Sequence, residues 1–253
     1  MFVTNFQSHN TLSWTRSDGI GNLILNMPPS NTMSFRFFNE FKEWIGNPDR
    51  FDGLKAVIIH GAGRHFSSGS DLDSLLSEID RVQQIVSGED TTCSVPPFLP
   101  ENYNSFLALE RLNLPVIAAI SGVCIGSGFE LSLFCDFRIC THDAVLGLPE
   151  STFGLMPGLG GIQRFAQLAG KSRAVEYVLR GCTFQASDAL EMGLVDLTVP
   201  RSELLNACHD LILHLPGVHD RELRKLTLSN YRRIKASNGV ITRNCNKLKT
   251  NDK

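Results

Sequence analysis

The stretch "PVIAAISGVCIGSGFELSLFCDFRIC", residues 115–140, decides the fold. It begins with an apolar run typical of a buried strand, turns at glycines and serines, continues at helical length, and ends in a second strand-like run. A strand that leads into a helix and then into another strand is typical of an α/β protein with mostly parallel pairing. One residue does not suit a core: Glu130 lies between Phe129 and Leu131. Burying an unpaired carboxylate costs several kcal/mol or forces it to take up a proton.

The alternation of strand and helix patterns continues on both sides of this stretch. The run "LKAVIIHG" (54–61) indicates a buried strand that ends in a glycine loop, and a helix is predicted over 71–86. An irregular loop rich in turn residues is expected over 87–102, followed by a helix over 103–113. Short strand and helix patterns then follow one another from 145 to 200. These patterns predict one α/β core.

The two ends of the chain carry other patterns. Two β-rich runs around the turn Asp18-Gly19 predict a hairpin, and apolar residues at helical spacing predict a helix over 33–45. The cap candidates of that helix are Ser30, Asn31 and Thr32. From residue 201 the pattern is helical only. We therefore divide the chain into a core, residues 1–200, and an α-helical C-terminal subdomain with a basic tail, residues 201–253.

Length and composition limit the class of protein. With 253 residues, 42% of them hydrophobic, the chain suits one soluble globular domain with a large core. Its apolar runs are too short for a transmembrane helix, and its N-terminus lacks the regions of a signal peptide. Seven cysteines scattered through apolar stretches indicate a reduced protein, so we expect a cytoplasmic location and no membrane partner. Cys135 and Cys140 are expected in the core rather than in a metal site.

Charge is unevenly spread along the chain. The net charge is −2, yet the segment from Arg221 to the end has 10 Lys or Arg against 2 Asp or Glu. Such asymmetry often marks a tail that meets an anionic partner. A solvated helix followed by a frayed terminus explains it equally well.

Three stretches share one physical design: a strand, a loop of small residues and the start of a helix. They are "IIHGAGRHFSSGSDL" (58–72), "ISGVCIGSGFEL" (120–131) and "LPESTFGLMPGLGGIQR" (148–164). Small residues let a ligand approach the backbone, and helix N-termini offer unpaired N–H groups. Two such groups that converge on one carbonyl oxygen form an oxyanion hole. Taken singly, each glycine turn can equally serve only packing. Glu130 can be a buried acid in an ion pair, and Glu150 can be a charge that stabilises a helix N-terminus.

The order of the three motifs resembles the enoyl-CoA hydratase/isomerase (crotonase) superfamily. The motifs are F-x-x-G-x-D-L, G-x-x-x-G-x-G-x-E-L and P-E-x-x-x-G-x-x-P-G-x-G-G-x-Q-R, and the similarity covers roughly residues 55–200. The resemblance implies an α/β fold with a crotonase-like ββα spiral core and an α-helical C-terminal subdomain. It also implies an acyl thioester substrate, no cofactor, and assembly as a homotrimer or homohexamer.

The resemblance assigns site residues. The oxyanion donors are the backbone N–H groups of Ser70 and Ser127, where small residues, often Ala and Gly, stand in the family. Gly158 matches a position whose N–H helps to hold a water molecule. The other substrate-binding positions are Ser68, Gly69, Asp71, Leu72, Asp73 and Gly126. Apart from these, we expect structural roles for Asp136, Arg138 and the loop residue His65.

The resemblance also gives Glu130 and Glu150 a reaction. In hydratases of this family, glutamates at these positions flank a water that adds to C3 of a 2-enoyl thioester while C2 gains a proton. Two carboxylates in one partly desolvated site push their pKa values apart, so that one accepts a proton while the other donates. We assign Glu130 to the water and Glu150 to C2, although the pair titrates jointly and the opposite assignment can be argued.

Functions other than that of a hydratase are also compatible with the sequence. A Δ3,Δ2-enoyl-CoA isomerase or a racemase-type member needs no bound water, and a dehydratase could act on an acyl-carrier-protein thioester instead of acyl-CoA. An RNA-binding module is the alternative from another class, but the net charge of −2 and the lack of interleaved aromatic and basic residues argue against it.

The sequence departs from the family at its phosphate contacts. Asp73 stands where many members carry a basic residue, and "MPPSNTM" lacks the usual Lys or Arg. Basic residues of the tail could supply these contacts instead. They are Arg232, Arg233, Lys235, Lys247 and Lys249. For assembly, one helix face after residue 201 offers more apolar residues than a surface helix needs. They are Leu204, Leu205, Cys208, Leu211 and Ile212.

Overall fold

A computed structural model describes residues 10–77, 98–215 and 220–237. Within them the larger sheet has six strands in the order β1-β2-β3-β4-β6-β9. β1 and β2 form the predicted antiparallel hairpin, and the other pairs are parallel. The strands are β1 (Leu12–Ser17), β2 (Ile20–Leu25), β3 (Ala56–Gly61), β4 (Val116–Ile120), β6 (Phe137–Thr141) and β9 (Leu197–Val199).

The chain passes repeatedly between this sheet and a smaller one. The smaller sheet contains β5 (Val123–Ile125), β7 (Val145–Gly147) and β8 (Thr183–Gln185). β4 leads to β5 and then to α4 (Ser127–Phe134). β6 likewise leads to β7, to the 3-10 turn η3 (Pro149–Phe153) and to α5 (Gly161–Ala169). Each pass adds two strands and a helix, which is the ββα unit predicted for the core.

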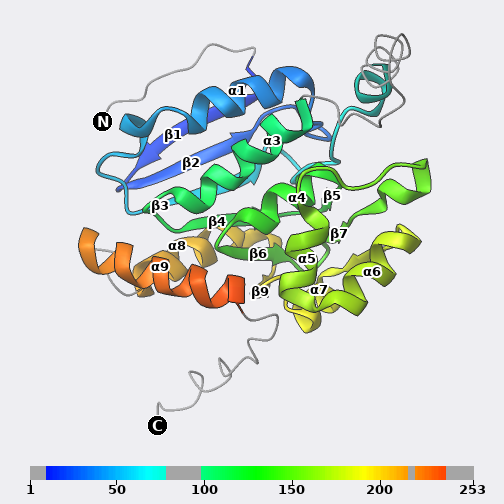
Figure 1. Ribbon diagram of the computed structural model, residues 1–253. Coiled ribbons are helices and arrows are strands. Elements are labelled where there is room, and N and C mark those ends of the chain that lie inside the picture. The colour runs from blue at the N-terminus through cyan, green and yellow to red at the C-terminus, as the bar shows by residue number, and fades with distance from the viewer. Residues whose placement is uncertain (1–9, 78–97, 216–219, 238–253) are drawn as a thin grey trace.

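Helices cover both faces of the larger sheet (Figure 1). α1 (Phe35–Ile45) and α3 (Phe98–Leu107) lie on one face, and α8 (Leu204–His214) packs against β4 and β6 on the other. α9 (Arg221–Ser237) follows α8. Other helical segments are α6 (Lys171–Arg180), α7 (Ala186–Met192), η1 (Pro48–Phe51), η2 (Ala108–Arg111) and η4 (Arg201–Glu203). Both C-terminal helices agree with the predicted pattern, while the division of the chain at residue 200 stays a prediction.

Side chains of the parallel strands alternate between two apolar layers. Val57 and Ile59 of β3 belong to the larger core cluster, which includes the buried aromatic residues of α1, whereas Ile58 belongs to the cluster with α8. Cys208 and Ile212 of α8 are buried in that second cluster, together with Leu204. The apolar face of α8 therefore covers the sheet of its own chain, and Leu205, which we placed on that face, is 42% exposed.

Two predicted helix starts are wrong. The cap of α1 is Ser34, not Ser30, Asn31 or Thr32: its hydroxyl accepts from the N–H of Phe37. The side chain of Asn31 is used elsewhere, since it accepts from Met27 and donates to the carbonyls of Ala62 and His65. α3 begins at Phe98 rather than at 103, so residues 98–102 of the predicted loop are helical. The predicted helix over 71–86 is seen over 72–77, and residues 78–97 lie outside the described residues.

A partly buried ion pair fastens α9 to the core. Arg232 donates from Nε to Oδ1 and from Nη2 to Oδ2 of Asp136, each over 2.7 Å. Asp136 also accepts from the N–H of Val116, and its side chain is only 3% exposed. The same guanidinium donates to the carbonyl oxygens of Glu110, Leu112 and Leu114. The planar, five-donor geometry of arginine suits this arrangement, and a lysine could not reproduce it.

This contact corrects one expectation about the basic tail. We offered Arg232 as a phosphate ligand, but its donors are occupied by Asp136 and by backbone carbonyls. Arg233 is exposed, and Lys247 and Lys249 lie outside the described residues. Arg138 has a structural role too: it is 1% exposed and donates to the carbonyls of Leu194 and Cys135.

Replacing Arg232 by methionine is expected to lower the free energy of unfolding by about 3 kcal/mol, because the buried carboxylate of Asp136 loses its countercharge. Urea denaturation measures this loss. Arg233→Met is the matched control, since the side chain of Arg233 is exposed, and it should change stability by less than about 0.5 kcal/mol. Equal effects of the two substitutions would contradict a role of the ion pair in holding α9.

Candidate active site

Hydrogen bonds on two sides hold the first segment of the site, residues 66–71. On one side the carbonyl of Gly69 accepts from the N–H of Met33. On the other side Ser67 forms a parallel bridge with Cys124, and its carbonyl accepts from Ile125 of β5. Gly69 has a φ of +90°, and a Cβ there would come within 3.0 Å of the Ile125 carbonyl oxygen. Only glycine lets this loop lie so close to β5.

The second segment is the turn from β5 into α4. Gly126 has a φ of +54°, which favours glycine, and its N–H donates to the carbonyl of Gly147. α4 starts directly after it at Ser127, and all 8 residues of this helix are buried. The first N–H groups of a helix have no partner inside it and carry its positive dipole end. The turn thus directs this end of α4 towards the first segment.

The two segments bring Ser70 and Ser127 together, although 57 positions separate them in the chain. Their hydroxyl oxygens lie 2.6 Å apart, so one serine donates a hydrogen bond to the other. Within the described part of the chain, neither backbone N–H has a protein acceptor. Two unpaired N–H groups at one place can stabilise a carbonyl oxygen that gains negative charge.

Glu130 is held from the opposite side by a loop that leads into α5. Its Oε1 accepts from the N–H of Leu159 at 2.8 Å and from the N–H of Gly161 at 2.9 Å. A Cβ on Gly161 would lie 2.6 Å from Cγ of Glu130, so glycine is required for this approach. With a relative exposure of 1%, Glu130 is the buried acid that the sequence indicates. Its partners are backbone N–H groups and not a cation.

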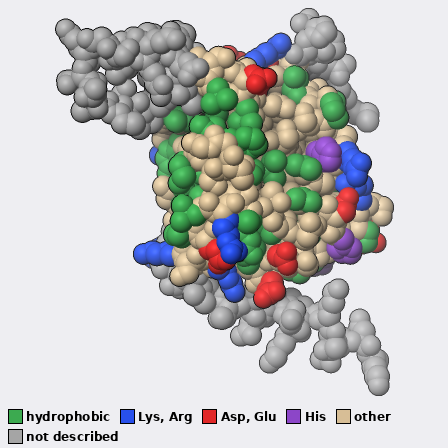
Figure 2. All heavy atoms as spheres, turned by 90° about the vertical axis from the view of Figure 1, so that its right-hand side faces the viewer, with side chains coloured by type: hydrophobic (Ala, Val, Ile, Leu, Met, Phe, Trp, Pro, Cys, Tyr) green, Lys and Arg blue, Asp and Glu red, His purple; other side chains and the backbone are tan. Residues whose placement is uncertain are grey.

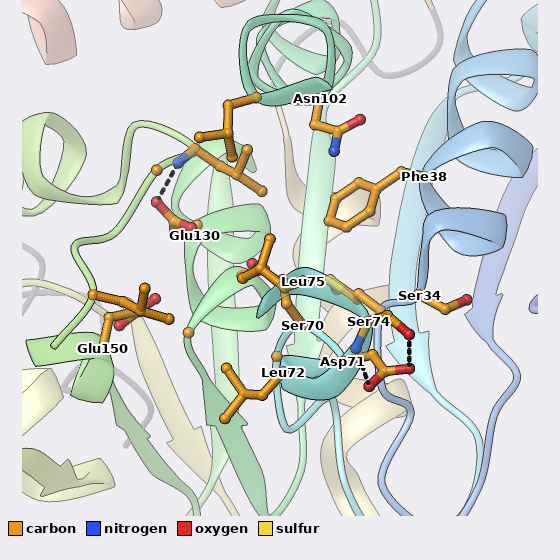
Figure 3. A pocket seen from close by; sticks show the side chains of 18 of the residues that line it. Ser34, Phe38, Ser70, Asp71, Leu72, Ser74, Leu75, Asn102, Glu130 and Glu150 are labelled. Atoms are coloured by element: carbon orange, nitrogen blue, oxygen red, sulfur yellow. Dashed lines mark hydrogen bonds between the residues drawn. The ribbon is translucent and has the colours of Figure 1, made fainter. Parts of the chain in front are cut away.

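Glu150 lies in η3, and Figure 3 shows it on the same side as Glu130, away from Phe38 and Ser34. A Cβ on Gly126 would lie 3.3 Å from Oε1 of Glu150, so this carboxyl reaches the start of α4. Its Oε2 is buried and has no hydrogen-bond partner among the described residues. A buried carboxylate oxygen without a partner is costly unless a ligand or water uses it, so it is typical of a functional position.

Burial keeps both carboxyls protonated to unusually high pH. Loss of solvent, with the nearby Glu150 as a second cause, raises the pKa of Glu130 to about 8, while the hydrogen bonds from Gly161 and Leu159 act in the opposite direction. Burial likewise raises the pKa of Glu150 to about 7. Because burial raises both pKa values towards neutral pH, the pair can accept and donate protons in the same site.

A cavity of about 210 Å³ joins these groups (Figure 3). Of the predicted site residues, its wall contains Ser68, Gly69, Ser70, Asp71, Leu72, Gly126, Ser127, Glu130, Glu150 and Gly158. Asp73 is exposed and does not line it, because the helical turn over 72–77 directs Leu72 and Leu75 to the cavity and Asp73 to solvent. The contact that we predicted for Asp73 is not supported by this placement.

Two helices contribute wall residues that the sequence analysis did not assign. α1 and the residues before it contribute Met33, Ser34, Phe35 and Phe38, and α3 contributes Phe98, Leu99 and Asn102. The apolar face of residues 33–45 was visible in the sequence as a helix face. Which cavity that face would line depends on tertiary packing.

The described residues offer neither a metal site nor a membrane span. Among them, no three His, Cys, Asp or Glu side chains lie together as metal ligands would. No helix in the same part of the chain is long and apolar enough to cross a membrane.

Comparisons with known proteins agree with this geometry. The family model described as enoyl-CoA hydratase/isomerase matches residues 15–239. A probable enoyl-CoA hydratase of Bacillus subtilis is 32% identical over 189 residues, which cover 74% of this chain and 69% of the relative. A peroxisomal Δ(3,5)-Δ(2,4)-dienoyl-CoA isomerase of Arabidopsis thaliana is 35% identical over 208 residues, which cover 79% and 74%.

Other similar proteins extend the comparison. The chain spans only 27% of the alpha subunit of a Shewanella loihica fatty acid oxidation complex, to which it is 36% identical over 201 residues, 78% of this chain. A crystal structure of an enoyl-CoA hydratase/isomerase from Xanthobacter autotrophicus Py2 matches with a TM-score of 0.76 and 27% identity. It covers 90% of this chain and 81% of that chain. Since the family model matches most of the chain and relatives above 30% identity align over most of it, this chain belongs to the enoyl-CoA hydratase/isomerase family.

Proposed function

We propose that this protein is a hydratase that adds water across the 2,3 double bond of a 2-enoyl-CoA thioester. The observation that carries the proposal is the convergence of a buried carboxyl, Glu130, and a half-buried one, Glu150, with two unpaired N–H groups in one cavity. The hydratase name of the Bacillus subtilis relative supports the same reaction. Acyl-CoA is the substrate in this proposal, and the chemistry calls for no cofactor.

The proposed reaction begins with the thioester carbonyl. The N–H groups of Ser70 and Ser127 bind its oxygen and stabilise the enolate charge that develops there, which makes C3 electrophilic. A water held between the two carboxyls loses a proton to one of them and forms a bond to C3, while the other carboxyl supplies the proton at C2. One proton leaves the water and one reaches carbon, so the net change is the addition of water.

The two proton transfers, from the water and to C2, cannot be assigned to one carboxyl each, because the two groups titrate as a pair. From the sequence we assigned Glu130 to the water and Glu150 to C2. Burial raises the pKa of both carboxyls, to about 8 for Glu130 and to about 7 for Glu150, so either one can hold the proton near neutral pH. Since the groups titrate together, we propose the pair as the acid and base without dividing the two steps.

An isomerase is the second candidate. The family description includes isomerases, and the Arabidopsis thaliana relative is named as one. Moving a proton from one carbon to another needs a single carboxyl that takes and returns it, whereas adding water uses both. For this reason the presence of two carboxyls in the same cavity favours the hydratase.

Replacing each carboxyl by its amide tests the reaction. Glu130→Gln and Glu150→Gln keep the shape of the side chain, and in a hydratase each should lower kcat for a 2-enoyl-CoA by about 10²-fold or more with little change in KM. Glu176→Gln, at an exposed position of α6, is the control and should leave kcat unchanged. A mild effect of Glu130→Gln on a 3-enoyl-CoA, beside a severe effect of Glu150→Gln, would instead identify an isomerase.

Stability should depend on pH through Glu130. Its pKa is about 8 in the folded protein and near 4.5 when unfolded, so the folded state binds the extra proton between these values. Stability is therefore lost as pH rises from about 4.5 to 8. Glu130→Gln removes this loss and should be more stable than the unsubstituted protein at pH 8 by on the order of 1–4 kcal/mol, with a smaller difference at pH 5. Denaturation at both pH values measures it, and an equal difference at both would contradict the raised pKa.

We also propose that the protein assembles as a homotrimer or homohexamer and that it is located in the cytoplasm. The face of the molecule in Figure 2 carries many hydrophobic side chains. Exposed apolar residues of the described chain include Phe153, Met156, Val175 and Leu179. Apolar surface of this kind often marks contacts between proteins. Analytical ultracentrifugation at micromolar concentration should show trimers or hexamers, and a monomer under those conditions would be contrary to this proposal.

A further inference from the structure

Among the polar side chains of the cavity wall, one is used neither by the proposed chemistry nor by a hydrogen bond within the described residues. Asn102 lies in the middle of α3 and is 3% exposed, yet it lines the cavity. Figure 3 shows its amide extending from α3 on the side of Phe38. Its backbone carbonyl accepts from Ser105, but its side-chain amide has no hydrogen-bond partner among the described residues. An amide in a cavity wall that has no partner in the protein is available to hydrogen bond to a ligand.

The side chains around Asn102 are apolar, so they suit an acyl chain better than a nucleotide. Phe35, Phe38, Phe98 and Leu99 line the same cavity. Leu99 also touches the catalytic end, since a Cβ on Gly158 would lie 3.2 Å from it. Asn102 follows Leu99 by one helical turn, roughly 5 Å along the axis. The amide therefore lies beside apolar side chains of the cavity wall, one turn of α3 beyond Leu99.

We propose that this cavity selects acyl chains that carry an uncharged oxygen function, a hydroxyl or keto group, which hydrogen bonds to Asn102. The inference rests on the proposed thioester function and specifies its substrate class. An asparagine amide offers both donors and an acceptor, so it can pair with either group. A carboxylate on the chain is disfavoured, because no Lys or Arg of the described residues lines the cavity, whereas Asp71, Glu130 and Glu150 do.

A plain alkyl chain is expected to bind this site with lower affinity than a chain that carries an oxygen function. Without substrate, water can hydrogen bond to the amide, but an alkyl chain displaces that water and returns no hydrogen bond. Sites built to hydrogen bond a substrate group discriminate strongly against analogues that lack it. For one buried amide we expect discrimination of roughly 10- to 100-fold.

The test compares saturated acyl-CoA esters, which cannot be hydrated, by titration calorimetry. One series carries a hydroxyl at successive carbons from C4 outward, and the reference is the plain ester of equal length. The unsubstituted protein should bind one hydroxylated ester at least about 10-fold tighter than the plain one. Asn102→Leu should abolish this preference and bind the plain ester more tightly. Asn104→Leu, at an exposed position of the same helix, should keep it.

The outcomes separate this inference from the proposed function. If the protein and Asn102→Leu show the same ratio of affinities, the inference is wrong, even if 2-enoyl-CoA is hydrated normally. If the preference exists and disappears in Asn102→Leu while no enoyl-CoA is hydrated, the inference holds and the hydratase proposal fails. Absence of binding by every ester overturns both. Should Asn102→Leu not fold, Asn102→Ala removes the same amide and has the same expected result.

Discussion

The arrangement of the site depends on how a buried carboxylate is held. Within the described residues Glu130 forms no ion pair, and the N–H groups of Leu159 and Gly161 bind its Oε1. These donors come from the loop that enters α5, so this interaction ties α5 to α4 and places the loop with Gly158 over the cavity. Two N–H groups satisfy the oxygen without neutralising it as a cation would, which leaves the carboxyl able to change its proton.

The glycines of the site follow from this constraint. A side chain at position 161 would collide with Glu130, and one at position 69 would meet the backbone of β5. Both positions allow segments far apart in the chain to approach within contact distance, and the hydroxyl pair of Ser70 and Ser127 then joins them. The resulting site holds two carboxyls whose pKa values are raised by burial. Active sites of this kind commonly lower the stability of the folded protein in exchange for activity.

A different ion pair determines what the C-terminal helices can do. Arg232 binds Asp136 where the chain enters β6, so α9 is joined to the core at the end of the central helix α4. The same residue was a candidate ligand for phosphate when only the sequence was considered. Its neighbour Arg233 is exposed, because successive residues of a helix point in different directions. Charge composition could therefore not distinguish a structural arginine from a solvated one.

The sequence by itself determined the class of fold and the segments of the site. Periodicity predicted the hairpin, the parallel alternation and both C-terminal helices, and Glu130 was recognised because a carboxylate stood in an apolar run. These are local signals, since they depend on residues a few positions apart. The sequence did not correctly predict the cap of α1 or the start of α3, because several serines and turn residues compete at these positions and packing decides among them.

The resemblance paired Ser70 with Ser127 and Glu130 with Glu150, but only the tertiary structure decided the contacts through which the segments meet. The approach of Ser70 to Ser127, the two backbone donors to Glu130 and the position of Asn102 in the cavity wall join residues from separate elements. No local pattern encodes such contacts, because they follow from the register of the sheets and the close approach that glycines permit. The outward direction of Asp73 has the same origin: the helical turn at 72–77 fixes which of its side chains reach the cavity.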